Sequence, residues 1–91
     1  MALRINIHQG FIRGHTDYPN TVEATGNTVG ECLNDLVRQL PAIKKEIFDE
    51  SGELQLDTCV FVNGESAFPE ELGKSVRDGD VIDLLPITAG G

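Results

Sequence analysis

Basic residues are scarce in this sequence. Of its 91 residues, seven are Lys or Arg and fifteen are Asp or Glu, so the formal net charge is −8. The seven basic residues are also scattered along the chain. Because nucleic-acid phosphates require clustered Lys and Arg, nucleic acid is excluded as a partner. An acidic surface instead suits a basic protein partner, and the charge would mainly accelerate encounter with it.

Long apolar runs and metal-type cysteine spacings are also missing. No apolar run approaches the length of a membrane span. The opening residues MALRINIHQG alternate instead of placing an apolar stretch after a charged one, so we expect no signal peptide. Cys32 and Cys59 fit no zinc or redox spacing. We expect a cytoplasmic protein with two thiols, no metal and no membrane partner, with a disulfide as the alternative for the cysteines.

Apolar and polar residues alternate in short segments, which is the pattern of half-buried strands. The predicted strands span residues 3–8, 20–25, 58–62 and 81–85. Asn63-Gly64 is a favoured two-residue hairpin turn, so a further short strand should follow it. Asp78-Gly79-Asp80 predicts a tight turn before the last strand.

One main helix is predicted over residues 28–40. Thr28 and Glu31 form a capping box, in which the Thr28 hydroxyl accepts from the Glu31 amide and the Glu31 carboxylate accepts from the Thr28 amide. Apolar residues then recur at helical spacing until Pro41 ends the helix. Because one helix cannot cover both faces of a sheet, we expect a two-layer α+β domain spanning residues 1–91, with a mixed four- to five-stranded sheet packed on one main helix.

This order of elements resembles the β-grasp fold of ubiquitin, and more closely the prokaryotic sulfur-carrier family. That family includes the small subunit of molybdopterin synthase, the thiamine-pathway carrier, and carriers for cysteine and homocysteine synthesis. The resemblance spans essentially the whole chain and is carried by TVGECL, VFVNGE and DGDVIDLLPITAGG. The loop FDESGELQLD is longer than in the most compact thiamine-type members, which counts against that branch. The resemblance implies that strands 3–8 and 81–85 are parallel neighbours.

The last residues, Gly90-Gly91, are expected to be the reactive end. The Gly91 α-carboxyl, with a pKa of about 3.3–3.7, is ionised at neutral pH and is a poor electrophile, so loading sulfur on it requires activation as an acyl-adenylate. Sulfide or a persulfide would then displace AMP and leave a thiocarboxylate. Glycines suit a narrow channel, and Pro86 is expected to hold the start of the tail away from the sheet. The predicted flexible tail spans residues 86–91 and comprises Pro86, Ile87, Thr88, Ala89, Gly90 and the reactive Gly91.

The resemblance implies that the chain binds no cofactor itself. ATP and magnesium would be used by a partner, an E1-like adenylating enzyme; sulfide or a persulfide sulfurtransferase would donate sulfur, and an acceptor enzyme would receive it. Gly73-Lys74-Ser75 resembles the end of a phosphate-binding loop, but position 68 is Phe where that motif requires Gly. His8 and His15 have no carboxylate or thiol at ligand spacing, so we expect both to be solvated.

Phe61 and Leu85 are predicted to face away from the core on neighbouring strands. With Cys59 and Val81 they form a candidate docking patch, and members of the family dock the corresponding sheet face on the activating enzyme and the acceptor. Against this, isolated exposed apolar residues are normal. Nothing near Cys59 would lower its pKa, so we interpret it as surface and Cys32 as a packing residue.

Three other functions compete with the sulfur carrier. The chain could be a ubiquitin-like protein modifier that is joined to a lysine through Gly91, which also requires adenylation. It could be a β-grasp interaction module for which Gly90 and Gly91 are dispensable. An autonomous enzyme is the least favoured, because the residues form no catalytic constellation.

Overall fold

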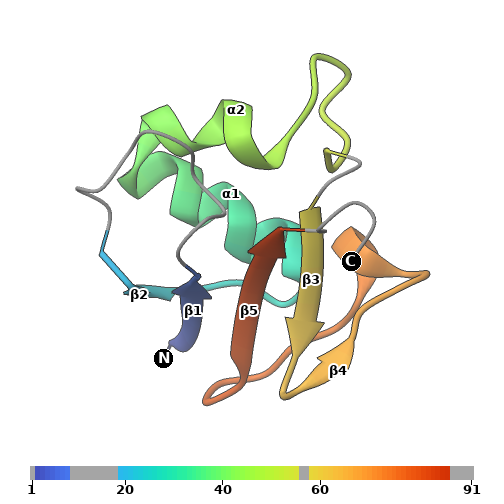
Figure 1. The fold of residues 1–91 in the computed structure, drawn as a ribbon. Coiled ribbons are helices and arrows are strands. Elements are labelled where there is room, and N and C mark those ends of the chain that lie inside the picture. The colour runs from blue at the N-terminus through green and yellow to red at the C-terminus, as the bar shows by residue number, and fades with distance from the viewer. Residues whose placement is uncertain (1, 9–18, 56–57, 87–91) are drawn as a thin grey trace.

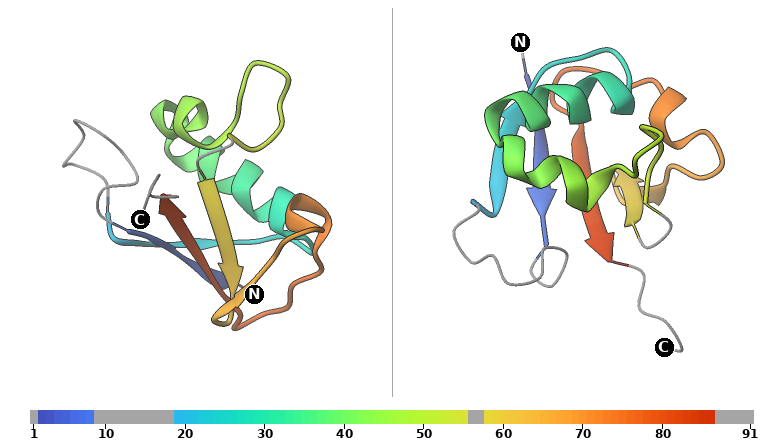
Figure 2. Two further views of the ribbon diagram at one scale, coloured as in Figure 1. Left: turned by 45° about the vertical axis from the view of Figure 1, so that its right-hand side comes forward. Right: turned by 90° about the horizontal axis from the view of Figure 1, so that it is seen from above.

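The computed structural model describes residues 2–8, 19–55 and 58–86. A five-stranded sheet in the order β2-β1-β5-β3-β4 carries helices on one of its faces (Figures 1 and 2). The strands are β1 Leu3–Ile7, β2 Thr21–Ala24, β3 Thr58–Val62, β4 Glu65–Ser66 and β5 Val81–Pro86. The helices are α1 Val29–Gln39 and α2 Lys44–Ile47, with the 3-10 turns η1 Pro41–Ile43 and η2 Glu71–Gly73. The predicted two-layer α+β arrangement is therefore confirmed.

The first and last strands form the middle of the sheet. β1 and β5 are parallel, with Ile5 opposite Ile82, as the resemblance implied. All other pairs are antiparallel. Because β5 lies between β1 and β3, it is hydrogen-bonded on both sides. β5 also extends one residue beyond its predicted end: Pro86 is paired with Thr58 and belongs to the strand, not to the predicted tail.

The core lies between α1 and the inner face of the sheet. Its inward strand residues alternate with outward ones, and the helix contributes residues at three- and four-residue spacing. Residues without solvent exposure come from both layers: Ile5, Val29, Cys32, Leu33, Leu36, Ile43, Ile47, Ile82 and Leu84. Burial of each such aliphatic side chain favours the folded state by about 1.5–3 kcal/mol relative to leaving it exposed. Cys32 is thus a core residue, as predicted.

The start of α1 differs from the predicted capping box in one bond. The Thr28 hydroxyl accepts from the Glu31 amide at 3.2 Å, as expected. The Glu31 carboxylate, however, accepts from the amide of Asn27 at 2.8 Å and not from that of Thr28. The reason is tertiary: residues 27–29 pair with residues 74–76, through Val29 N–Lys74 O at 2.9 Å and Val76 N–Asn27 O at 3.0 Å. This pairing holds Thr28 extended and leaves the Asn27 amide facing the carboxylate.

Two turns are joined at the start of β5. Asn63 and Gly64 have φ values of 52° and 85°, as the predicted hairpin turn requires. The Asn63 side chain accepts from the Val81 amide at 2.9 Å and donates to Asp80 at 3.1 Å. The Asp80 carboxylate also accepts from the Arg77 amide at 2.8 Å, and these two hydrogen bonds lower its pKa. The motif DGD therefore fixes where the last strand enters the sheet.

Candidate functional site

The sheet face opposite the helices is the candidate site. Figure 2 shows that the helices lie on one side of the sheet, and no described element covers the other side. The pairing registers place outward residues of all five strands in one row across this outer face: Thr21, Asn6, Asp83, Phe61 and Ser66. A second row places Leu85 beside Cys59. The outer face thus combines a polar half on β1 and β2 with an apolar half on β5 and β3.

The predicted docking residues meet on the apolar half. Phe61 lies opposite Asp83 and Cys59 opposite Leu85, so residues of β3 and β5 form a continuous strip. Val81 lies on the same face two residues before Asp83, opposite Arg4. The four predicted docking residues are half-buried. The structure therefore brings together the residues from which the patch was predicted.

A hydrogen-bonded chain crosses the polar half and ends at β5. The Thr21 hydroxyl donates to Oδ1 of Asn6 at 3.0 Å, and the Asn6 amide donates to Oδ1 of Asp83 at 3.0 Å. Nε2 of His8 lies 2.9 Å from the same Asp83 oxygen. His8 is exposed, as expected, but it has a carboxylate within hydrogen-bond distance. Parallel pairing of β1 with β5 brings in a carboxylate that linear spacing could not reveal.

The strand that leads to the predicted reactive end is the best anchored in the sheet. β5 is paired along both edges up to its C-terminal half, and five residues, 87–91, follow it in the sequence. Ile87, Thr88, Ala89, Gly90 and Gly91 lie outside the described residues, as does His15. Fully extended, five residues span at most about 18 Å.

The two thiols differ in their surroundings. Burial, and then the nearby carboxylates of Glu31, Asp35 and Asp80, raise the pKa of the Cys32 thiol to about 11, so this thiol is unreactive at neutral pH. Cys59 is half-buried on the outer face, and neither thiol is in a disulfide. Within the described ranges, no three His, Cys, Asp or Glu side chains gather as a metal site would require. Nor does any helix there have the length and hydrophobicity to cross a membrane.

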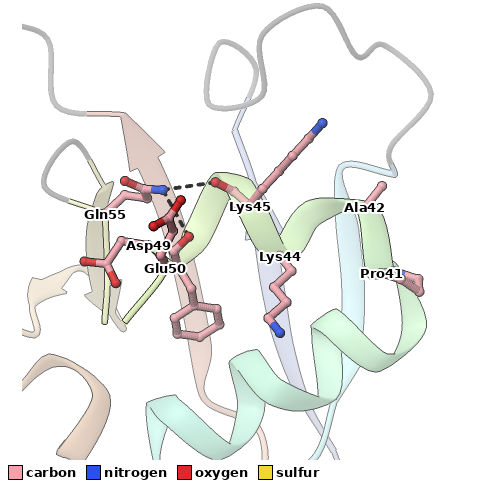
Figure 3. Close-up of a pocket in the computed structure, with 8 residues that line it drawn as sticks. Pro41, Ala42, Lys44, Lys45, Asp49, Glu50 and Gln55 are labelled. Atoms are coloured by element: carbon pink, nitrogen blue, oxygen red, sulfur yellow. Dashed lines mark hydrogen bonds between the residues drawn. The ribbon is translucent and has the colours of Figure 1, made fainter. Parts of the chain in front are cut away.

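A pocket lies on the helical side of the molecule, away from the outer face. It has a volume of about 430 Å³ and is formed by η1, α2 and the loop after them (Figure 3). Gln55 closes one end by donating to the carbonyls of Lys45 and Phe48 at 3.1 and 3.0 Å. The Lys44 and Lys45 side chains point in different directions in Figure 3 and do not converge on a common point. The two lysines of the pocket therefore do not form a common binding point for an anion.

The exposure of one large apolar residue was not predicted from the sequence. Phe68, after β4, is 73% exposed and is the only large hydrophobic residue so exposed in the described part of the chain. It follows Ala67, which is buried, and precedes Pro69. Its exposure depends on where the connection after β4 leaves the sheet edge, and no periodic pattern in the sequence signals this.

The fold and the outer face define a β-grasp domain in which a central last strand leads to a glycine-ended segment. The chain belongs to the ThiS family, whose model matches residues 16–91. The resemblance stated from the sequence is thereby confirmed.

Individual relatives agree with this assignment. The chain is 34% identical over 83 residues to the sulfur carrier protein CysO of Mycobacterium tuberculosis. This alignment covers 88% of this chain and 89% of CysO. It is 39% identical over 64 residues to small archaeal modifier protein 1 of Haloferax volcanii, covering 70% of each. The structure matches CysO in the Amycolatopsis orientalis BexX/CysO complex with a TM-score of 0.82 and 35% identity, over 99% of this chain and 100% of that one. The predicted β-grasp fold is confirmed by these neighbours.

Proposed function

We propose that this protein is a ubiquitin-like sulfur carrier whose Gly91 α-carboxylate is converted to a thiocarboxylate. Membership of the ThiS family and the description of its relatives as sulfur carrier proteins support a carrier, with catalysis supplied by other proteins. The observation that carries the proposal is the position of β5. A strand held on both sides leads directly into ITAGG, so the folded domain acts as a rigid handle for this short segment.

The proposed chemistry has two steps. An oxygen of the Gly91 carboxylate attacks the α-phosphorus of ATP, and pyrophosphate leaves with the magnesium ion. Hydrosulfide then attacks the acyl carbon, AMP leaves, and one oxygen of the original carboxylate has been replaced by sulfur. Both steps require an E1-like adenylating enzyme that supplies the ATP site. The proposal requires that Gly91 carry the free α-carboxylate.

The outer face is the proposed docking surface for that enzyme and for the acceptor of the sulfur. Complexes of relatives, such as CysO with BexX, support the view that such carriers work bound to partner proteins. A half-buried apolar strip beside polar groups is the composition of a protein interface. Of the acceptor classes that the family resemblance implies, the identity with CysO favours the cysteine type. Two free thiols suit the cytoplasm as the compartment.

Intact-mass spectrometry tests the proposal. With ATP, magnesium, hydrosulfide and the adenylating enzyme of the same organism, the intact chain should gain the mass difference between one sulfur and one oxygen, mapped to Gly91. A chain without Gly91 should fold equally well and show no change, since a terminal residue contributes few packed contacts. Normal sulfur loading of the shortened chain would contradict the mechanism.

A protein modifier is the second candidate, and one observation favours it. The relative with the higher identity, 39%, is named small archaeal modifier protein 1. In that function the Gly91 adenylate would be attacked by a lysine amine of a target, which forms an amide and releases AMP. Conjugates of higher mass that disappear on deletion of Gly91 would identify this activity, and the carrier and modifier functions can coexist in one chain.

A further inference from the structure

Asp83 lies at the centre of the outer face among apolar neighbours. Four residues flank it there: Val81 and Leu85 along its own strand, and Asn6 and Phe61 across the neighbouring strands. Three of these four are apolar. The Asp83 side chain is 21% exposed, so its carboxylate is largely enclosed even without a partner protein. A charged group in such surroundings needs polar partners in any bound state.

Only one of the two carboxylate oxygens is occupied. Oδ1 accepts from the Asn6 amide and pairs with His8. Among residues 2–8, 19–55 and 58–86, no group forms a hydrogen bond to Oδ2. His8 is the only Lys, Arg or His side chain of these residues within ion-pair distance of Asp83. Arg4 is diagonal to Asp83 across β1 and makes no ion pair with it. The chain of bonds from Thr21 therefore holds the carboxylate in place, and no residue that the structure describes occupies its second oxygen.

We propose that the outer face docks a protein that presents an arginine to Oδ2 of Asp83. This inference rests on the proposed carrier function, and it identifies the docking partner by the side chain that it must bring. Docking on Phe61 and Leu85 would remove water from Asp83. Without a new donor, the buried negative charge would oppose binding strongly.

Arginine fits this position better than lysine. Its guanidinium is planar and weakly hydrated, and it can lie over the Phe61 ring while donating to the neighbouring carboxylate. A lysine ammonium is compact and strongly hydrated, and it would lose more of its hydration between Phe61 and Leu85. The net charge of −8 also favours a partner that is basic at its docking site.

The test compares two variants that each remove one negative charge from the outer face. Asp83→Asn keeps the size and the bond from Asn6, and Glu23→Gln, on β2, lies outside the apolar strip. Calorimetric titration against the adenylating enzyme of the same organism, without ATP, should show binding weakened about 30-fold or more for Asp83→Asn. For Glu23→Gln the change should stay below about threefold, because an exposed charge acts weakly and at long range. Equal effects of the two variants would overturn the proposal.

A second measurement modifies the enzyme chemically. Enzyme treated with phenylglyoxal, which modifies arginine, should bind the wild-type chain as weakly as untreated enzyme binds Asp83→Asn. Acetylation of the enzyme's lysines should leave binding unchanged. If phenylglyoxal has no effect, no arginine is engaged and the inference is wrong. If Arg4→Gln weakens binding as much as Asp83→Asn does, the chain's own Arg4 neutralises Asp83. That result would overturn the inference as well.

The outcomes separate this inference from the carrier function. If the wild-type chain binds the enzyme and gains sulfur while Asp83→Asn binds equally well, the arginine contact alone is excluded. If the wild-type chain neither binds nor gains sulfur, both proposals are excluded. Thermal melting of each variant shows whether the chain is folded during the titration.

Discussion

Nε2 of His8 lies 2.9 Å from Oδ1 of Asp83, although 75 residues separate the two in the sequence. The contact exists because β1 and β5 are adjacent parallel strands, so the C-terminal residues of β1 lie beside residues of β5. Asp83 therefore belongs both to the polar chain that starts at Thr21 and to the apolar strip of β3 and β5. The outer face has a defined boundary at this residue, and a docking protein must match both halves.

The apolar strip should be necessary for docking. Phe61→Ser should weaken binding to the adenylating enzyme about tenfold or more, because the side chain contributes buried apolar area at the centre of the face. Serine is preferable to aspartate here, since an aspartate at 61 would stand opposite Asp83 and destabilise the pair. Titration calorimetry at constant salt measures the change.

Phe68→Ser is the matched control for that prediction. Phe68 is 73% exposed and lies beyond β4, away from β5, so its truncation should leave the affinity within about twofold. Reduced affinity with Phe68→Ser and unchanged affinity with Phe61→Ser would move the docking surface to the edge of the sheet at β4.

Much of the fold could be predicted because its signals are local. Alternation in LRINI, the turn residues Asn63-Gly64, and the helical spacing after Thr28 each depend on residues within a few positions. The parallel pairing of the first and last strands came from the family resemblance and was confirmed. The apolar strip followed from the same alternation, which assigns Phe61 and Leu85 to one face once the strands are neighbours.

What the sequence did not reveal depends on contacts between distant segments. The Glu31 carboxylate bonds to Asn27 because residues 74–76 pair with the start of α1. The His8–Asp83 contact requires the register of two strands at opposite ends of the chain. Pro86 joins β5 because its partner is Thr58, and local propensity disfavours proline in a strand. None of these partners could be identified from spacing in one sequence.

The N-terminal cap of α1 should have a measurable effect on stability. Thr28→Ala removes the hydroxyl that accepts from the Glu31 amide, and should lower the free energy of unfolding by about 1 kcal/mol. Thr28→Ser keeps the acceptor and should lose less than half of that. Urea denaturation of the three proteins measures the difference, and equal losses in the two variants would show that the hydroxyl is not the stabilising group.

The flexible character required of residue 90 gives a prediction about the reactive end. Gly90→Val should slow sulfur loading about tenfold or more, since a β-branched residue restricts the backbone and adds bulk in a narrow channel. Ala89→Val adds similar bulk where a Cβ already exists and should slow loading less. Time-resolved intact-mass spectrometry compares the variants, and melting temperatures equal to that of the wild type would show that the folded domain is unaffected. Unchanged loading of Gly90→Val would contradict the narrow-channel argument.

The buried thiol of Cys32 should make stability depend on alkaline pH. Burial and the adjacent carboxylates raise its pKa from 9.0 to about 11 in the folded protein. Between these values the folded state retains the proton and the unfolded state has lost it, so stability falls as the pH rises. The free energy of unfolding should decrease by up to about 3 kcal/mol across this window, relative to a chain without the thiol. Urea denaturation at several pH values between 8 and 11 measures the decrease in the wild type and in Cys32→Ala. Cys59→Ala retains the buried thiol and should follow the wild type, whereas parallel pH profiles for the wild type and Cys32→Ala would show that Cys32 does not titrate abnormally.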